Sequence, residues 1–217
     1  MKFNTVFWDI DGTLYDNTQE IPDNEKEILS SWKKLEEIPE RELTFWVPYQ
    51  GLSKIMATIP QENQGVISNG IHQLQIDKLC LLGLKRHINP ALIFTSYGEA
   101  EKILTLNDHP FLKDQNIYAS PNFDTNVYNM TLKTQKPEPF MFKKAINITK
   151  SLPEECVMIG NNWKDIQGAQ SVGMKTIYIS GAEEKEDLFY NPIAEGDIIP
   201  DYSIRKGDMD SLARLLI

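Results

Sequence analysis

The stretch TVFWDIDGTLYDN, residues 5–17, begins as an apolar strand and ends among acids. Residues 6–8 are apolar, as in a buried strand, and Asp9 and Asp11 follow two positions apart before the chain turns at Gly12. Two carboxylates this close need a cation, or one of them must take up a proton. The stretch therefore predicts a functional site at a strand tip, and a hard divalent ion such as Mg²⁺ suits its oxygen ligands.

Short apolar runs alternate with amphipathic helical patterns along the rest of the chain. Strands are predicted at residues 3–9, 64–68, 91–95, 155–160 and 175–180. Helices are predicted at residues 23–38, 49–58, 71–82, 99–106, 137–150, 164–172 and 208–217. A segment rich in Pro, Asn and aromatic residues, 109–132, resembles a short pair of strands. The alternation predicts an α/β fold with a doubly wound parallel sheet.

Polar residues follow three of the predicted strands directly. Asp9 and Asp11 follow the first strand, Ser68 and Asn69 end the second, and residues 160–165 follow the fourth. In a doubly wound sheet, ligands bind beyond the carboxyl ends of the strands. We therefore expect these residues to line one edge of the sheet.

The composition limits the classes of partner. The chain has 217 residues and a net charge of −9, and it has no run of Lys or Arg. Such a chain repels nucleic acids and anionic membranes, so neither is predicted as a partner. The N-terminal sequence lacks a signal-peptide pattern, and no segment has the roughly 18 apolar residues that span a bilayer. These features predict a cytoplasmic protein. The sequence makes no prediction of oligomeric state.

The two cysteines, Cys80 and Cys156, lie among apolar residues and are predicted to be buried free thiols. Trp163 lies among the polar residues after the fourth strand. Tryptophans in such positions more often pack in the core or against a helix cap than stack on a base, so a packing role is predicted.

Four ordered motifs resemble those of the haloacid dehalogenase superfamily in its phosphatase form. They are DIDGT (9–13), VISNG (66–70), QKPEPFMF (135–142) and MIGNNWKDIQGAQSVGMKTIYI (158–179). The run SNGIHQLQIDKLCLLGL (68–84) also resembles the subfamily that includes haloacid dehalogenases and several small nucleotidases. Four motifs in order are a strong signal, whereas any one alone would be weak. The resemblance implies a Rossmann-like core.

The resemblance also implies a role for each motif residue. Asp9 would attack phosphorus and form an aspartyl phosphate, and Asp11 would serve as general acid and then general base. Ser68, with backbone amides near Asn69, would bind the phosphoryl oxygens. Lys136 would screen the charge of Asp9 from that of the phosphate. Dehalogenases lack the second acid, so its presence favours phosphoryl transfer.

The resemblance implies Mg²⁺ as the cofactor. Its ligands would be Asp9, the backbone oxygen of Asp11, and the fourth motif with Asn161 and Asp165. The fourth motif departs from the family pattern because Asn161 stands where an acid is usual. One negative charge fewer predicts weaker Mg²⁺ binding.

The resemblance fails in two places, which are interpreted as inserts. The predicted core is 1–14 and 48–217, with a small cap at 15–47 and a second insertion at 97–133. The cap is interpreted as a truncated form of the family's helical cap, a hairpin of two helices. The second insertion either completes a lid over a small phosphomonoester or leaves an open site that binds a macromolecule or a second subunit. Its aromatic residues are Tyr97, Phe111, Tyr118, Phe123 and Tyr128. Closure over a small ligand is the preferred interpretation.

The sequence as a whole predicts a Mg²⁺-dependent phosphomonoester hydrolase acting on a small phosphorylated metabolite, such as a nucleotide or a sugar phosphate. Asn161 and the unusual inserts leave an alternative open: a catalytically weak binding protein that uses its inserts for a macromolecular partner.

Overall fold

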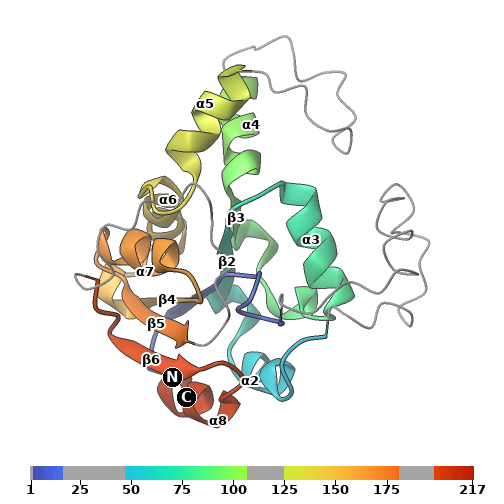
Figure 1. The fold of residues 1–217 in the computed structure, drawn as a ribbon, viewed down its shortest axis with the longest axis vertical. Helices are drawn as coiled ribbons and strands as arrows, with labels where there is room; N and C mark the ends of the chain where they lie inside the picture. Colours follow the sequence, from blue (N-terminus) through green and yellow to red (C-terminus); the bar gives the residue numbers. More distant parts are fainter. Residues whose placement is uncertain (1, 17–46, 107–124, 181–197) are drawn as a thin grey trace.

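The computed structural model describes residues 2–16, 47–106, 125–180 and 198–217 (Figure 1). The predicted helix 23–38 and most of the predicted cap lie outside these residues. No helix in the described part is long and apolar enough to cross a membrane.

The described residues form one parallel sheet of six strands in the order β3-β2-β1-β4-β5-β6. The strands are β1 (Thr5–Trp8), β2 (Gln64–Ser68), β3 (Ile93–Thr95), β4 (Cys156–Gly160), β5 (Lys175–Ser180) and β6 (Tyr202–Arg205). The doubly wound parallel sheet predicted from the sequence is therefore confirmed. β1 is central, so the acids that follow it emerge between β2 and β4.

Strand β6 was not predicted. Its four residues lie at the sheet edge, and only Ile204 among them is buried. Because an edge strand needs little apolar surface, its sequence lacks the apolar run that identified the other strands.

Helices lie on both faces of the sheet (Figure 1). They are α2 (Leu52–Thr58), α3 (His72–Leu81), α4 (Ser96–Leu106), α5 (Thr125–Thr134), α6 (Phe140–Thr149), α7 (Trp163–Gln170) and α8 (Met209–Leu216). Each predicted helix within the described residues is present, with ends that differ by up to three residues.

The predicted pair of strands at 109–132 is wrong where the structure describes it. Residues 125–134 form helix α5, which packs along α4, and the two helices project together from the sheet (Figure 1). The Thr134 hydroxyl at the end of α5 donates a 2.7 Å hydrogen bond to the Ser96 carbonyl. Thr, Val and Tyr in this segment favour strands, but packing against a neighbouring helix overrode that preference.

Alternate residues of β1 pack into two separate cores. Val6 and Trp8 belong to the core under α2, α3 and α8, whereas Phe7 packs with α6 and α7 on the other face. All three side chains are 0% exposed, so β1 is covered on both faces, as in α/β sheets.

The predicted burial of the cysteines holds for one of them only. Cys156 in β4 is buried, whereas Cys80 on α3 is exposed. The apolar neighbours of Cys80 misled the prediction, because helix periodicity turns it away from the face that carries Leu79.

Candidate active site

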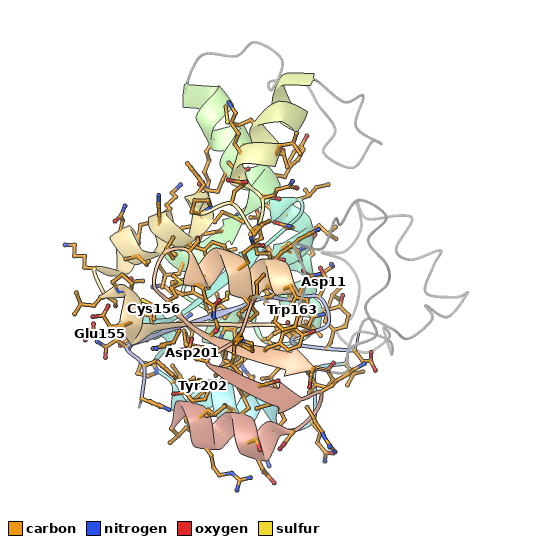
Figure 2. All side chains as sticks on the ribbon, turned by 60° about the vertical axis from the view of Figure 1, so that its left-hand side comes forward. Asp11, Glu155, Cys156, Trp163, Asp201 and Tyr202 are labelled. Atoms are coloured by element: carbon orange, nitrogen blue, oxygen red, sulfur yellow. The ribbon has the colours of Figure 1, made fainter. Side chains whose placement is uncertain are left out.

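The first two motifs lie at the carboxyl edge of the sheet, where β1 and β2 end. Asp9 directly follows β1, and its N–H donates a 2.9 Å hydrogen bond to the Ile159 carbonyl of β4. The chain then turns at Gly12, whose φ of 77° is unfavourable for other residues. Figure 2 shows Asp11 at this end of the sheet and Glu155 and Cys156 at the opposite end. The expected edge is therefore present.

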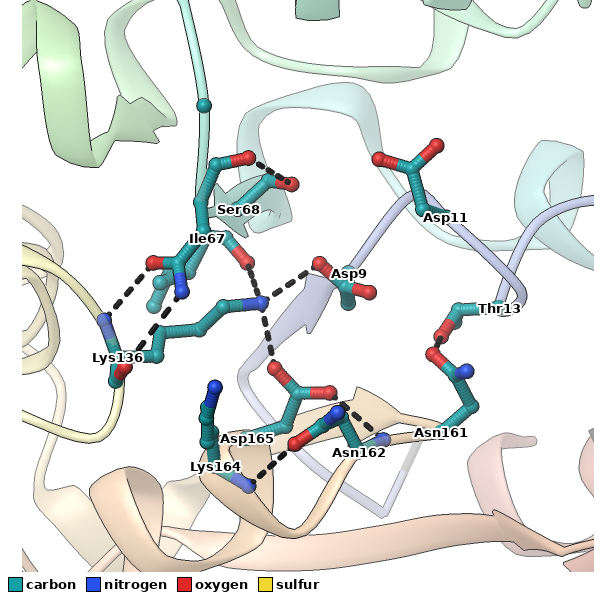
Figure 3. Close-up of polar contacts among 12 residues, drawn as sticks. Asp9, Asp11, Thr13, Ile67, Ser68, Lys136, Asn161, Asn162, Lys164 and Asp165 are labelled. Carbon is teal, nitrogen blue, oxygen red and sulfur yellow. Dashed lines mark hydrogen bonds and ion pairs between the residues drawn. The ribbon is translucent and has the colours of Figure 1, made fainter. Parts of the chain in front are cut away.

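Lys136 lies at the centre of the site, although it comes from the loop before α6. Its Nζ lies 2.6 Å from Asp9 Oδ1, 2.5 Å from Asp165 Oδ1 and 3.2 Å from the Ile67 carbonyl oxygen (Figure 3). The three charged side chains are 5%, 8% and 0% exposed for Lys136, Asp9 and Asp165. The lysine thus joins the first, second and fourth motifs.

Asn69 fixes the main chain that carries this lysine. The Asn69 Oδ1 accepts a 2.8 Å hydrogen bond from the Lys136 N–H, and its Nδ2 donates to the Lys136 carbonyl at 3.5 Å. Asn69 therefore acts as a bridge between the end of β2 and the loop of the third motif. The sequence indicated a role for its backbone and not this side-chain role.

The charges set the protonation of the buried lysine. Burial alone would lower the pKa of Lys136, but the carboxylates of Asp165 and Asp9 outweigh it and raise that pKa above its ordinary value. Lys136 is therefore an ammonium at neutral pH. Burial raises the pKa of Asp165, with Asp9 adding to the rise and Lys136 opposing it.

Asp165 is held against Gly160 in the fourth motif. Its Oδ2 accepts a 3.1 Å hydrogen bond from the Asn162 N–H, which forms a capping box at the start of α7. A Cβ added at Gly160 would lie 2.2 Å from Asp165 Oδ2, so only glycine leaves room for the carboxylate. The requirement for glycine in this motif therefore follows from the position of Asp165.

Asn161 faces the turn that follows β1. Its Oδ1 accepts a 3.0 Å hydrogen bond from the Thr13 hydroxyl (Figure 3). This contact links the first motif to the fourth and holds the amide oxygen against the Thr13 hydroxyl. The role of Thr13 was not predicted, although it is part of the DIDGT motif.

Ser68 ends β2 and is 1% exposed. Its hydroxyl lies 3.4 Å from the Asn69 carbonyl oxygen, a long contact, and the turn continues with a 3.0 Å hydrogen bond from the Gly70 N–H to Ser96 Oγ. Ser68 lies near Asp9 and Lys136 in Figure 3, and the Asn69 side chain contacts the main chain of Lys136. The structure thus brings together the predicted phosphate-binding residues.

Asp11 lies apart from this cluster. Its carboxylate points away from Asp9 in Figure 3 and is 36% exposed. It accepts hydrogen bonds from Lys78 Nζ at 2.6 Å, from Gln75 Nε2 at 3.4 Å and from the Tyr15 hydroxyl. Burial would raise the pKa of Asp11, but its charge pairing with Lys78 and these hydrogen bonds lower it below the ordinary value.

The three partners of Asp11 were missed from the sequence. Gln75 and Lys78 lie three positions apart on α3 and therefore share a helix face. Both are buried, which is uncommon for polar residues without a partner. A polar pair on the core-facing side of a helix was the available signal.

Trp163 lies at the start of α7, near the candidate site (Figure 2). Its ring stacks on Tyr178 of β5 with centroids 4.4 Å apart and planes at 15°. This contact agrees with the packing role that the sequence favoured.

The residues predicted to bind Mg²⁺ fit this ion in part. Asp9, the main-chain oxygen of Asp11 and the amide oxygen of Asn161 offer the oxygen ligands that hard cations prefer. One carboxylate oxygen of Asp165 forms an ion pair with Lys136, and the other accepts a hydrogen bond from the Asn162 N–H. Both oxygens are therefore engaged in contacts that hold the lysine and the start of α7. Direct coordination by Asp165 stays a prediction. Within the described ranges, no cluster of three or more His, Cys, Asp or Glu residues is arranged to hold a metal.

Comparisons with known proteins agree with these motifs. The family model HAD-hydrolase-like matches residues 134–203. Over 190 residues the chain is 27% identical to the pyrophosphatase PpaX of Bacillus mycoides, covering 83% of this chain and 85% of that protein. It is 41% identical to the glyceraldehyde 3-phosphate phosphatase of Pyrococcus furiosus over 63 residues, which are 28% of this chain and 26% of that relative.

In sequence, the chain is similar to the haloacid dehalogenase-like hydrolases over residues 134–203. Its fold is similar to that of YfnB of Bacillus subtilis, a HAD-hydrolase whose structure holds magnesium, with a TM-score of 0.56, 16% identity and coverage of 100% of this chain and 99% of that one. The comparisons confirm the superfamily and the enzyme class that the four motifs predicted, a haloacid dehalogenase-like phosphatase.

Proposed function

We propose that this protein is a Mg²⁺-dependent phosphomonoester hydrolase that acts through an aspartyl phosphate on Asp9. The observation that carries the proposal is the position of the Lys136 ammonium, 2.6 Å from Asp9 Oδ1 in a buried site. A carboxylate attacking a phosphate faces charge repulsion, and a fixed cation beside it reduces that repulsion.

In the first step, an Asp9 oxygen attacks phosphorus, and the bond from phosphorus to the ester oxygen breaks. The fraction of Asp11 that carries a proton gives that proton to the leaving oxygen. The Ser68 hydroxyl and main-chain amides near Asn69 donate hydrogen bonds to the phosphoryl oxygens. Lys136 balances the negative charge around Asp9.

In the second step, Asp11 takes a proton from a water molecule, which attacks the phosphorus of the aspartyl phosphate. The bond from phosphorus to the Asp9 oxygen breaks, and inorganic phosphate leaves with Asp9 restored. Asp9, the Asp11 carbonyl oxygen and Asn161 would hold Mg²⁺, with Asp165 as a further predicted ligand. The ion would supply positive charge that neutralises the phosphoryl oxygens.

The substrate is proposed to be a small phosphorylated metabolite. Two relatives, a glyceraldehyde 3-phosphate phosphatase and a pyrophosphatase, carry names that support this class. Nucleoside monophosphates and sugar phosphates are the first candidates. The proposed lid at 97–133 includes α4 and part of α5, whereas Phe111, Tyr118 and Phe123 lie outside the described residues.

The test is hydrolysis of a generic aryl phosphate with Mg²⁺, compared between the wild type and Asp9→Asn. We expect turnover by the wild type and a loss of at least about 10³-fold in the variant, since the nucleophile is removed. Equal rates would contradict the proposal. A panel of nucleotides, sugar phosphates and a phosphopeptide then tests the substrate class, and turnover of the phosphopeptide alone would contradict a small substrate.

One observation favours a second function. Asn161 removes an acid from the fourth motif, so a catalytically weak protein that binds a macromolecular partner through its inserts is the alternative. The same assay separates the two, because a binding protein would show no turnover that depends on Asp9.

A further inference from the structure

Both oxygens of the Asp11 carboxylate are held by other side chains. Lys78 and Tyr15 donate hydrogen bonds to Oδ1, and Gln75 donates to Oδ2 at 3.4 Å. Tyr15 is 4% exposed, Gln75 2% and Lys78 9%. Three well-buried donors therefore surround a carboxylate whose own side chain is 36% exposed.

Two separate parts of the fold supply these donors. Gln75 and Lys78 come from one face of α3, and Tyr15 comes from the segment after β1. Gln75 Nε2 also donates a 3.0 Å hydrogen bond to the Asn69 carbonyl, so α3 connects Asp11 to the turn at the end of β2. The position of Asp11 relative to the predicted phosphate-binding turn is thus set by α3.

Two lysines of the site pair with aspartates in different surroundings. Lys136 pairs with Asp9, whose side chain is 8% exposed, in the closed centre of the site. Lys78 pairs with Asp11 at the more open side, where the Asp11 carboxylate points away from Asp9 (Figure 3). A leaving group departs on the side facing solvent, so this is where a proton donor would be needed.

We propose that Lys78 is a positioning residue that holds the Asp11 carboxylate on the leaving-group side of the site. Tyr15 is the second residue that holds this carboxylate. The inference rests on the proposed function, because it assigns Lys78 a role through the proposed acid and base. Lys78 itself touches no reacting atom in this assignment. Free rotation of Asp11 about its side-chain bonds would otherwise allow many positions, and three donors restrict it to one.

The test uses phosphate esters whose leaving groups differ in acidity. An activated aryl ester such as dinitrophenyl phosphate needs no proton donor to leave, whereas an alkyl phosphate does. The kcat/KM value reports the first step, in which the phosphoryl group moves to Asp9. We expect Lys78→Met to lower kcat/KM for the alkyl ester by about 10–100-fold and for the activated aryl ester by less than about threefold.

Three further variants sharpen the test. Lys78→Arg keeps the charge and is expected to recover most of the alkyl-ester activity. Tyr15→Phe removes one hydroxyl and should give the same preference for the activated ester with a smaller loss, which keeps the inference testable if Lys78→Met fails to fold. Lys175→Met removes a lysine that pairs with Asp201 at 2.8 Å where β5 begins, and should leave both rates unchanged.

A double variant tests whether Lys78 acts through Asp11. If it does, Asp11→Asn/Lys78→Met is no slower on the alkyl ester than Asp11→Asn alone. An additional loss in the double variant, or an equal loss of both esters in Lys78→Met and Tyr15→Phe, would overturn the inference while leaving the phosphatase intact. A wild type that hydrolyses neither ester would overturn the proposed function, and the inference with it.

Discussion

Lys136 and Asp165 form an ion pair of 2.5 Å in which the two side chains are only 5% and 0% exposed. The pair joins the loop before α6 to the first turn of α7, and Asp9 completes it at 2.6 Å from the same nitrogen. Since a buried charge without a partner is costly, each member depends on the others. The architecture of the site and the stability of the fold are therefore linked at this point.

Replacing Lys136 by Met should destabilise the protein. The change leaves Asp9 and Asp165 close together and buried without a cation, and we expect a loss of about 3–5 kcal/mol in the free energy of unfolding. Urea denaturation measures it. The double variant Lys136→Met/Asp165→Asn removes one of the two unpaired charges and should recover part of the loss.

The exposed lysine Lys175 provides the control for that experiment. Its side chain is 43% exposed, so Lys175→Met should cost less than about 1 kcal/mol. Similar losses for the buried and the exposed lysine, or no recovery in the double variant, would show that the buried pair does not couple the two elements.

Gly160→Ala should impair catalysis through Asp165. The added methyl group would lie 2.2 Å from Asp165 Oδ2, so the carboxylate must move and take Lys136 with it. Small displacements of this kind reduce rates by about 10²-fold, which aryl phosphate hydrolysis would detect as a fall in kcat.

Gly65→Ala is the matched control, because Gly65 lies near the start of β2, at the end of the sheet away from the site. There a Cβ would lie 2.6 Å from Phe7 Cε1 and 2.7 Å from the Leu92 carbonyl oxygen. We expect it to reduce stability, while the kcat of the folded protein stays near that of the wild type. If Gly160→Ala had the same profile, the glycine would serve packing alone.

Asn161→Asp should reduce the Mg²⁺ requirement. The carboxylate adds a negative charge among oxygen ligands, and ligand charge sets the affinity for hard cations. We expect the half-saturating Mg²⁺ concentration to fall roughly tenfold, measured by titrating Mg²⁺ into the hydrolysis assay. Asn63→Asp, which adds the same charge before β2, should leave the requirement unchanged. An unchanged value for Asn161→Asp would remove the proposed role of this residue.

Asp201 should stabilise the protein in a way that depends on pH. It accepts hydrogen bonds from Lys175 Nζ at 2.8 Å and from the Thr176 N–H at 3.0 Å. Desolvation would raise the pKa of Asp201, but these bonds outweigh it and lower that pKa. Its contribution is therefore fully present above the unfolded-state value of about 3.9 and disappears as the pH falls through the lower folded-state value.

Asp201→Asn tests this contribution. Since the site is partly exposed, we expect a loss of about 1 kcal/mol at pH 7. Urea unfolding at several pH values should show the wild type and the variant converging as the pH falls below the unfolded-state value of about 3.9. A difference in stability that stayed constant at every pH below that value would indicate that the charge of Asp201 makes no contribution.

Local sequence was enough to predict most of the sheet. Residues 64–68 and 175–180 form strands with the predicted ends, because continuous apolar runs identify buried parallel strands. Strand β6 and helix α5 were missed, since their stability comes from neighbours at a sheet edge and along α4.

The sequence alone determined which residues stand at the carboxyl ends of the strands, because chain order and strand length fix that position. It therefore identified Asp9, Asp11, Ser68 and Asn161 as candidates. Only the tertiary structure decided which lysine pairs with each acid: Lys136 forms an ion pair with Asp9, and Lys78 forms one with Asp11. The partners come from distant segments, and the packing of α3 and α6 on the sheet, which no local pattern encodes, sets the distances between their charges.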